Sequence, residues 1–158
     1  MLSLTTKPTL MSDSKNARKK FAHGLNCSQS IIAQYADRYQ LDVSTACKLA
    51  TGFGGGMGRM GNACGALTGA YLVLGLEYGS ESAAQKEKKD QTYEKIQTFT
   101  QEFEQRNGAC NCRDLLGCDI STKEGYQQAK EQGLTQSKCP GFVENAVQIL
   151  DEMINKKD

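Results

Sequence analysis

The chain has 158 residues, and its 19 basic and 18 acidic side chains give a formal net charge of +1 at pH 7. This length suits one domain, and a balanced charge without a basic stripe or tail argues against nucleic-acid or membrane-surface binding. Only two prolines, few β-branched runs and many helix-forming polar residues favour an all-α fold.

The N-terminal segment predicts a tail followed by two helices. We expect residues 1–18 to form a flexible tail, into which a first helix, Ser14 to Phe21, extends. Asn26 is a typical N-cap for the second helix. The apolar face of that helix recurs at spacings of three and four, at Ile31, Ile32, Tyr35 and Tyr39.

The middle of the chain predicts two further helices separated by glycines. A short helix follows residue 42, with Asp42 or Ser44 as its cap. Asn62 is the expected cap of the next helix, which Gly79 closes. Its predicted inner stripe is Leu67, Tyr71, Leu74 and Tyr78.

The C-terminal half predicts one long helix, a short turn of helix and two more helices. The long helix ends at Asn107-Gly108, and its predicted inner face is Tyr93, Ile96, Phe99 and Phe103. Ser121 and Glu124 match a capping box, and Pro140 is expected at the first position of the last helix. With no strand pattern, residues 19–158 predict a single-domain bundle of five to seven helices with a glycine-rich loop.

Seven cysteines make the chain cysteine-rich, and their odd number argues against a fully paired secreted framework. No signal peptide is recognised, and the most apolar run, residues 63–76, is too short to span a bilayer. We therefore expect a cytoplasmic protein without membrane insertion, in which clustered cysteines serve metal or redox chemistry.

The stretch "GFGGGMGRMGNACGALTGA", residues 52–70, contains eight glycines and one cysteine. Residues 56–61 match G-x-G-x-x-G, but a helix and not a strand is expected before them, so no nucleotide site is predicted. Gly65 and Gly69 lie in the helix that follows, where glycine costs about 1 kcal/mol relative to alanine. We therefore expect a neighbouring helix or a cofactor to pack against that face, and the loop to present Cys64.

Four cysteines, Cys27, Cys64, Cys112 and Cys139, are each predicted in the first turn of a helix. Free N–H groups and the helix dipole favour a thiolate there. Buried cysteine also serves as a small hydrophobic residue, which is the interpretation we give to Cys47. The C-x-C-x5-C spacing of 110–118 matches neither the paired zinc pattern nor the ferredoxin run, and a single histidine, His23, disfavours histidine-based catalysis.

The segments "NCSQSI", "GFGGGMGRMGNACGALTGAYLVLGLEYG", "CRDLLG" and "CPGFVENAVQIL" resemble the redox-active family labelled C_GCAxxG_C_C, from about residue 20 onward. The label reads GCAxxG, whereas here Cys64-Gly65-Ala66 follows Ala63. The resemblance implies a small helical redox domain with signature cysteines at Cys27, Cys64, Cys112 and Cys139. Cys110 and Cys118 lie close to Cys112 and remain alternatives for the third. A similar module joined to a multihaem cytochrome is suggested to hold an iron–sulfur cluster through four cysteines.

Our first hypothesis is therefore an electron-transfer or redox-sensing protein, rather than an enzyme that turns over a substrate. Cys27, Cys64, Cys112 and Cys139 would bind an iron–sulfur cluster, [2Fe–2S] in preference to [4Fe–4S], with Arg59 and Arg113 as nearby positive charges. The alternatives are cofactor-free thiol–disulfide chemistry, a structural zinc site and an interaction module with buried thiols. The electron partner is unknown, and a homodimer is left open.

Overall fold

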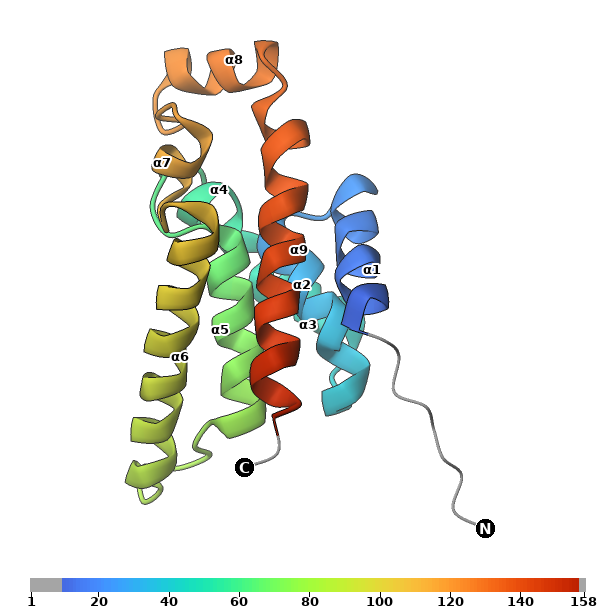
Figure 1. Cartoon of the computed structure of the whole chain (residues 1–158), viewed down its shortest axis with the longest axis vertical. Helices are drawn as coiled ribbons and strands as arrows, with labels where there is room; N and C mark the ends of the chain where they lie inside the picture. Colours follow the sequence, from blue (N-terminus) through green and yellow to red (C-terminus); the bar gives the residue numbers. More distant parts are fainter. Residues whose placement is uncertain (1–9, 157–158) are drawn as a thin grey trace.

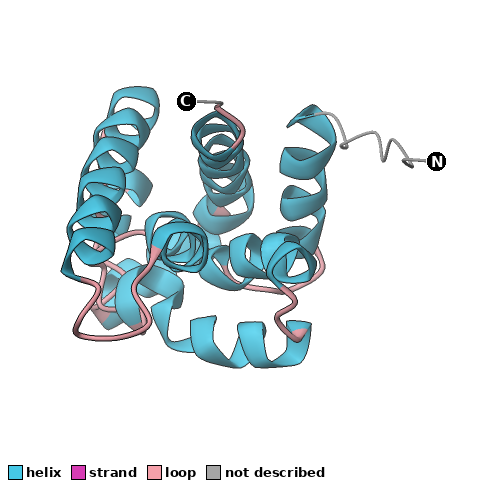
Figure 2. Cartoon of the chain, turned by 90° about the horizontal axis from the view of Figure 1, so that it is seen from below, coloured by secondary structure: helices cyan, strands magenta, loops and turns pink. Residues whose placement is uncertain are grey.

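The computed structural model describes residues 10–156 and shows helices joined by loops, with no strand in that part of the chain (Figures 1 and 2). The all-α class is confirmed. The helices are α1 (Leu10–Ala22), α2 (Cys27–Tyr35), α3 (Val43–Ala50), α4 (Gly54–Met57), α5 (Gly65–Tyr78), α6 (Lys86–Asn107), α7 (Cys112–Leu116), α8 (Lys123–Glu131) and α9 (Leu134–Ile154). Seven of these have eight or more residues, and the short α4 and α7 bring the count slightly above five to seven.

Helix α9 runs through the middle of the bundle (Figure 1). It packs against α1, α5 and α6, and α2 packs between α1 and α5. The inner face of α9 is fully buried, as expected for an amphipathic helix at the centre of a bundle. Its buried apolar residues are Val143, Ala146, Val147, Ile149 and Leu150.

Local capping signals place several helices where the sequence predicts them. The Asn26 side chain accepts a hydrogen bond from the Gln29 N–H, and the Gln29 side chain accepts one from the Asn26 N–H, which together form a capping box. The Asp42 carboxylate accepts a hydrogen bond from the Thr45 N–H and caps α3. Gly108, with φ of +90°, ends α6 in the left-handed conformation.

The first helix begins earlier than predicted, at Leu10 instead of Ser14. Residues 10–18 of the predicted tail therefore belong to α1, and residues 1–9 of that prediction lie outside the described residues. Buried contacts with α9 and α2 hold α1 in place, and packing of this kind outweighs the weak helix signal of a polar segment.

Three side-chain predictions are wrong. Tyr93 is 55% exposed and does not join Phe99 and Phe103 on the buried face of α6. Thr122, and not Ser121, caps α8, because its hydroxyl accepts the hydrogen bond from the Gly125 N–H. Cys64 itself occupies the N-cap position of α5, where Asn62 was expected.

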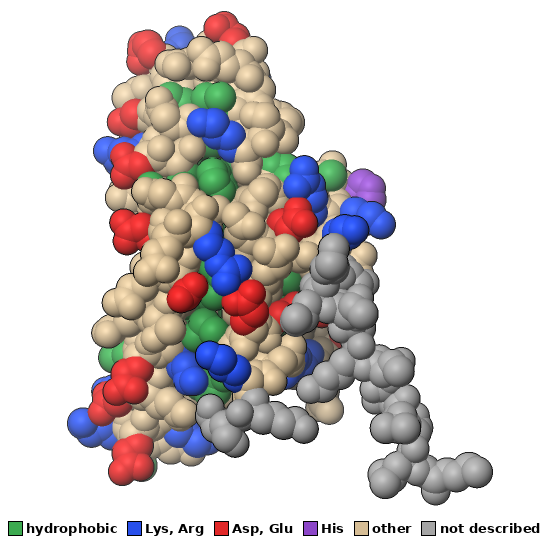
Figure 3. Space-filling model, in the orientation of Figure 1, with side chains coloured by type: hydrophobic (Ala, Val, Ile, Leu, Met, Phe, Trp, Pro, Cys, Tyr) green, Lys and Arg blue, Asp and Glu red, His purple; other side chains and the backbone are tan. Residues whose placement is uncertain are grey.

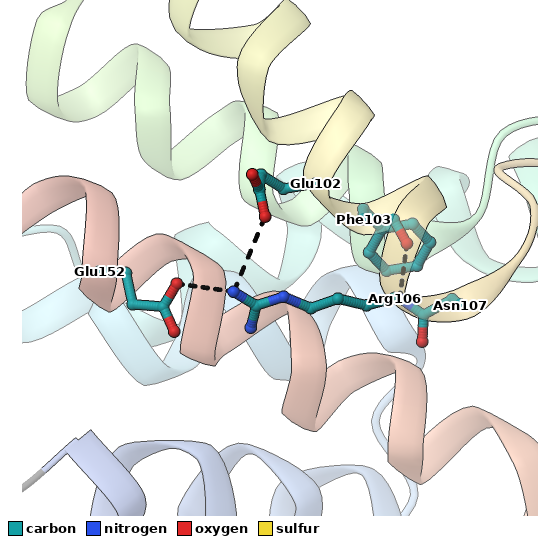
Figure 4. Close-up of polar contacts among 5 residues, drawn as sticks. All are labelled: Glu102, Phe103, Arg106, Asn107 and Glu152. Carbon is teal, nitrogen blue, oxygen red and sulfur yellow. Dashed lines mark hydrogen bonds and ion pairs between the residues drawn. The ribbon is translucent and has the colours of Figure 1, made fainter.

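Polar contacts also join the long helices at their outer faces. Arg106 of α6 donates a 2.7 Å hydrogen bond to Glu152 of α9 and lies 3.8 Å from Glu102 (Figure 4). Basic and acidic side chains are interspersed over the face drawn in Figure 3. Among the described helices, none combines the length and the apolar character that a membrane span requires.

A buried acid of α9 faces the core. The Tyr35 hydroxyl donates a hydrogen bond to Asp151 Oδ1, whereas Oδ2 has no hydrogen-bond partner among the described residues. Asp151 is 2% exposed, and burial raises the pKa of its carboxyl from the ordinary 3.8 to about 6, although the bond from Tyr35 lowers it in part.

The raised pKa of Asp151 predicts that the fold loses stability as the pH rises from 4 to 6. The folded state binds this proton more tightly than the unfolded state, so the stabilisation is complete below pH 4 and is lost as pH rises through 6. At about 1.4 kcal/mol per pH unit, the loss is up to about 3 kcal/mol. Asp151→Asn, which keeps the acceptor for Tyr35, should raise the free energy of unfolding at pH 7.5 and change it little at pH 4. Urea denaturation at both pH values measures this.

The matched control is exposed Asp37→Asn, and an equal effect of Asp151→Asn at both pH values would contradict the prediction.

Candidate functional site

Four cysteines from distant segments line one cavity of about 940 Å³. They are the four that the sequence singles out, Cys27, Cys64, Cys112 and Cys139. Each is between 4% and 8% exposed. Cys47, Cys110 and Cys118 are only partly buried and do not line the cavity. The fold therefore separates the seven cysteines into a buried group of four and three others.

Three of the four thiols interact directly. The Cys27 thiol forms hydrogen bonds with the thiols of Cys64 and Cys139. Cys112 lines the same cavity and interacts with Cys64 and Cys139 through charge. Chain segments separated by more than 100 residues thus deliver sulfur atoms to one region of the interior.

The environment divides these thiols into one acidic thiol and two weakly acidic ones. The hydrogen bond from Cys27 lowers the pKa of the Cys64 thiol, and the N–H groups of Ala66 and Leu67 lower it further at the start of α5. Hydrogen bonds with Cys139 and Cys64, together with burial, raise the pKa of Cys27. Burial raises the pKa of Cys112 to about 12. Of these three thiols, Cys64 is the one whose pKa is lowered.

The helix-start prediction holds for three cysteines and is wrong for Cys139. Cys27 and Cys112 are the first residues of α2 and α7, and Cys64 caps α5. Helix α9, however, begins at Leu134, after Gly133 in the left-handed conformation. Cys139 and Pro140 consequently lie inside α9, because the helix already includes residues 134–139. The sequence had predicted that the helix begins at Pro140.

The glycine-rich loop packs closely against the segment that contains Cys112 and is hydrogen-bonded to it. A Cβ atom on Gly56, whose φ is +70°, would lie 2.7 Å from the Cys112 Cβ atom, so only glycine allows this approach. The Cys112 N–H donates a 2.7 Å hydrogen bond to the Asn62 carbonyl, and the Cys64 N–H donates one of 2.9 Å to the Cys110 carbonyl. The loop thus positions two cavity cysteines at once.

The two predicted positive charges have different positions. Arg59 lines the cavity. Arg113 is not part of the lining, and its guanidinium donates hydrogen bonds to the Met60 and Gly61 carbonyls, at 3.1 and 3.2 Å. Arg113 therefore holds the glycine loop in place.

The glycines of α5 allow α2 to approach closely. Of the two expectations for this face, a neighbouring helix or a cofactor, the structure shows the helix. A Cβ atom on Gly65 would lie 2.9 Å from the Cys27 Cβ atom, and one on Gly69 would lie 2.8 Å from the Ser28 carbonyl oxygen. The start of α2 is consequently pressed against α5, and this contact brings Cys27 to Cys64.

Sequence reasoning missed the far wall of the cavity, which α8 provides. Tyr126, Ala129 and Lys130 line it, at spacings of three and four that place them on one face of a helix. That periodicity was available in the sequence. The contribution of α8 to the cavity of the cysteines, however, depends on how this helix crosses the end of the bundle (Figure 1).

Of the Cys, His, Asp and Glu side chains that the structure describes, only cysteines line the cavity. Within residues 10–156, no group of three or more His, Cys, Asp or Glu side chains is arranged to hold a single metal ion. Four nearly buried thiols match the ligand set of iron–sulfur clusters, in which cysteines are distributed over two or more irons. On this chemistry, the residues present fit such a group.

The comparisons with known proteins point to one family. The sequence model of a family described as "Putative redox-active protein (C_GCAxxG_C_C)" matches residues 25–153, which include all four cavity cysteines. Neither the curated proteins nor the solved structures contain a significant match to this chain.

The contact between α2 and α5 yields a matched pair of alanine substitutions in one helix. Gly65→Ala should lower the free energy of unfolding by about 1–3 kcal/mol, because its Cβ atom would meet Cys27 and the Ser28 backbone. Gly75→Ala meets nothing within 4 Å and should raise it by about 0.5–1 kcal/mol. Chemical denaturation measures both, and equal effects would show that the close approach is not required.

Proposed function

The chain belongs to the redox-active C_GCAxxG_C_C family, and on that premise we propose that Cys27, Cys64, Cys112 and Cys139 hold an iron–sulfur cluster. The observation that carries the proposal is their shared cavity, in which all four thiols are at most 8% exposed. Four thiolates complete the coordination of such a cluster. Its role would be electron transfer or redox sensing.

The contacts among the thiols favour [2Fe–2S] over [4Fe–4S]. Four cysteines shared between two irons place two sulfur ligands on each iron, whereas four irons take one each. Cys64 and Cys139 both raise the pKa of Cys27, and thiols near enough to influence one another suit ligands that share an iron. When bound, the cluster supplies one-electron oxidation and reduction.

The chain's own residues prepare the site in three ways. The N–H groups of Ala66 and Leu67 stabilise negative charge on the Cys64 sulfur. Leu115, Leu116 and Ile120 line the cavity with apolar surface, which limits the access of water to the sulfurs. The remaining thiols must release their protons on binding, so loading should become weaker as the pH falls.

The cluster is tested by iron and sulfide analysis on protein purified without oxygen and reconstituted. We expect about two irons and two sulfides per chain, with visible absorption bands. Serine at Cys27, Cys64, Cys112 or Cys139 should reduce the iron content to less than half. The controls are Cys47→Ser, Cys110→Ser and Cys118→Ser, which should retain it. A wild-type protein that stays colourless and free of iron after reconstitution would contradict the proposal, and stoichiometric zinc would favour the structural site instead.

Thiol–disulfide exchange is a second candidate, favoured by the direct contact between Cys27 and Cys64. The Cys64 thiolate would attack a small disulfide, form a mixed disulfide and release one thiolate. Cys27 would then lose its proton and attack the Cys64 sulfur, releasing the second thiolate. The net reaction converts two protein thiols and one small disulfide into a Cys27–Cys64 bridge and two small thiols.

The exchange hypothesis predicts one defined bridge. Metal-free protein treated with oxidised glutathione should form the Cys27–Cys64 disulfide, and dithiothreitol should reverse it. Differential alkylation and peptide mass mapping identify the pair. Cys27→Ser should leave Cys64 glutathionylated, because the second attack is lost, while Cys118→Ser should leave the bridge intact. A scrambled mixture of bridges would count against a dedicated pair.

A further inference from the structure

The cavity extends beyond its cysteines to a charged opening. At its inner end lie the buried thiols, whereas Arg59 and Lys130 also line it and are exposed. Among residues 10–156 they are the only charged side chains of the lining, and no carboxylate from that part of the chain lines the cavity. An entrance with positive charge alone favours an anion.

Both cations gather around one aromatic ring. The Arg59 guanidinium lies 4.9 Å from the centre of the Tyr126 ring, and the Lys130 ammonium lies 5.9 Å from it. Within the described residues, neither cation forms an ion pair. Both charges are therefore available to a ligand that enters beside Tyr126.

The backbone holds Arg59 in an unfavourable conformation. Its φ is +66°, a region that residues with side chains rarely occupy. The Arg59 N–H donates a 3.1 Å hydrogen bond to the Gly54 carbonyl, which fixes the loop in this shape. Strained backbone of this kind is concentrated at binding and active sites, and here it directs the guanidinium to the cavity.

Parts of the cavity wall are apolar. They are formed by Phe21, Leu25, Leu115, Leu116, Ile120 and Phe142. The volume of about 940 Å³ lies within the range of pockets that take small organic ligands. A compound that is only an anion, such as phosphate, would leave this apolar surface unused.

We propose that the cavity binds a small organic anion, with its carboxylate or sulfonate between Arg59 and Lys130 and its apolar body extending toward the cysteines. Such a ligand would place its body beside the sulfurs. Its role as the substrate of a redox centre rests on the proposed function, whereas its binding does not and is measured on metal-free protein.

The experiment compares two fluorescent probes that share one ring skeleton. One is 8-anilinonaphthalene-1-sulfonate, an anion, and the other is N-phenyl-1-naphthylamine, which is neutral. The full chain should bind the anion, and the double variant R59Q/K130Q should bind it about tenfold more weakly. The neutral probe should bind the wild type and the double variant equally. The control K123Q removes a cation from the same helix, α8, but outside the cavity, and should leave both affinities unchanged.

Alkylation locates the bound probe. Saturating sulfonate should protect Cys27, Cys64, Cys112 and Cys139 from iodoacetamide, while Cys47 should react as fast as before. The proposal is overturned if the wild type binds neither probe, if R59Q/K130Q weakens both equally, or if protection extends to Cys47. An absence of iron in the reconstituted protein would overturn the cluster and leave these results unaffected, so the two failures are distinguishable.

Discussion

Backbone without side chains lies against two of the four cavity cysteines. At Gly56 and Gly65 a single Cβ atom would come within 3 Å of Cys112 and Cys27, respectively, closer than real Cβ contacts allow. The two approaches are complementary, because one joins the glycine loop to α7 and the other joins α5 to α2. Cys64 lies between Gly56 and Gly65 in the chain. These two contacts therefore set the distances from Cys64 to Cys112 and to Cys27. The shared sulfur cavity depends on them.

Bringing four thiols together creates an electrostatic problem, because several buried thiolates would repel one another. The environments of the individual thiols differ in how they reduce this repulsion. Cys64 has N–H groups at a helix start and a thiol donor in Cys27, whereas burial raises the pKa of Cys112 to about 12. A site of this kind carries little negative charge while empty. A cationic centre would displace the protons from these thiols when it binds. Loading of the proposed ligand set is therefore coupled to the protonation of its thiols.

Local signals in the sequence were sufficient for most of the fold. The caps at Asn26 and Asp42 and the stop at Gly108 each depend on neighbouring residues, and the structure confirms them. The failures depend on distant packing. Pro140 is a good helix initiator in isolation, yet α9 begins six residues earlier, because Gly133 provides the break with α8. Tyr93 has the right spacing on α6 but is 55% exposed, whereas Phe99 is fully buried.

The candidate site shows the same division between local and distant information. Resemblance to a family and the position of cysteines near helix starts selected the four sulfurs, but no spacing could indicate that α8 closes their cavity from the far side. That wall is informative about function. A centre that only exchanged electrons through the protein would need its sulfurs covered, and a closely packed core would achieve this. Here α8 supplies Tyr126 and Lys130 to the cavity lining, and the Arg59 guanidinium lies over the Tyr126 ring. The open volume that the four cysteines share with α8 is therefore what the proposed anion would occupy.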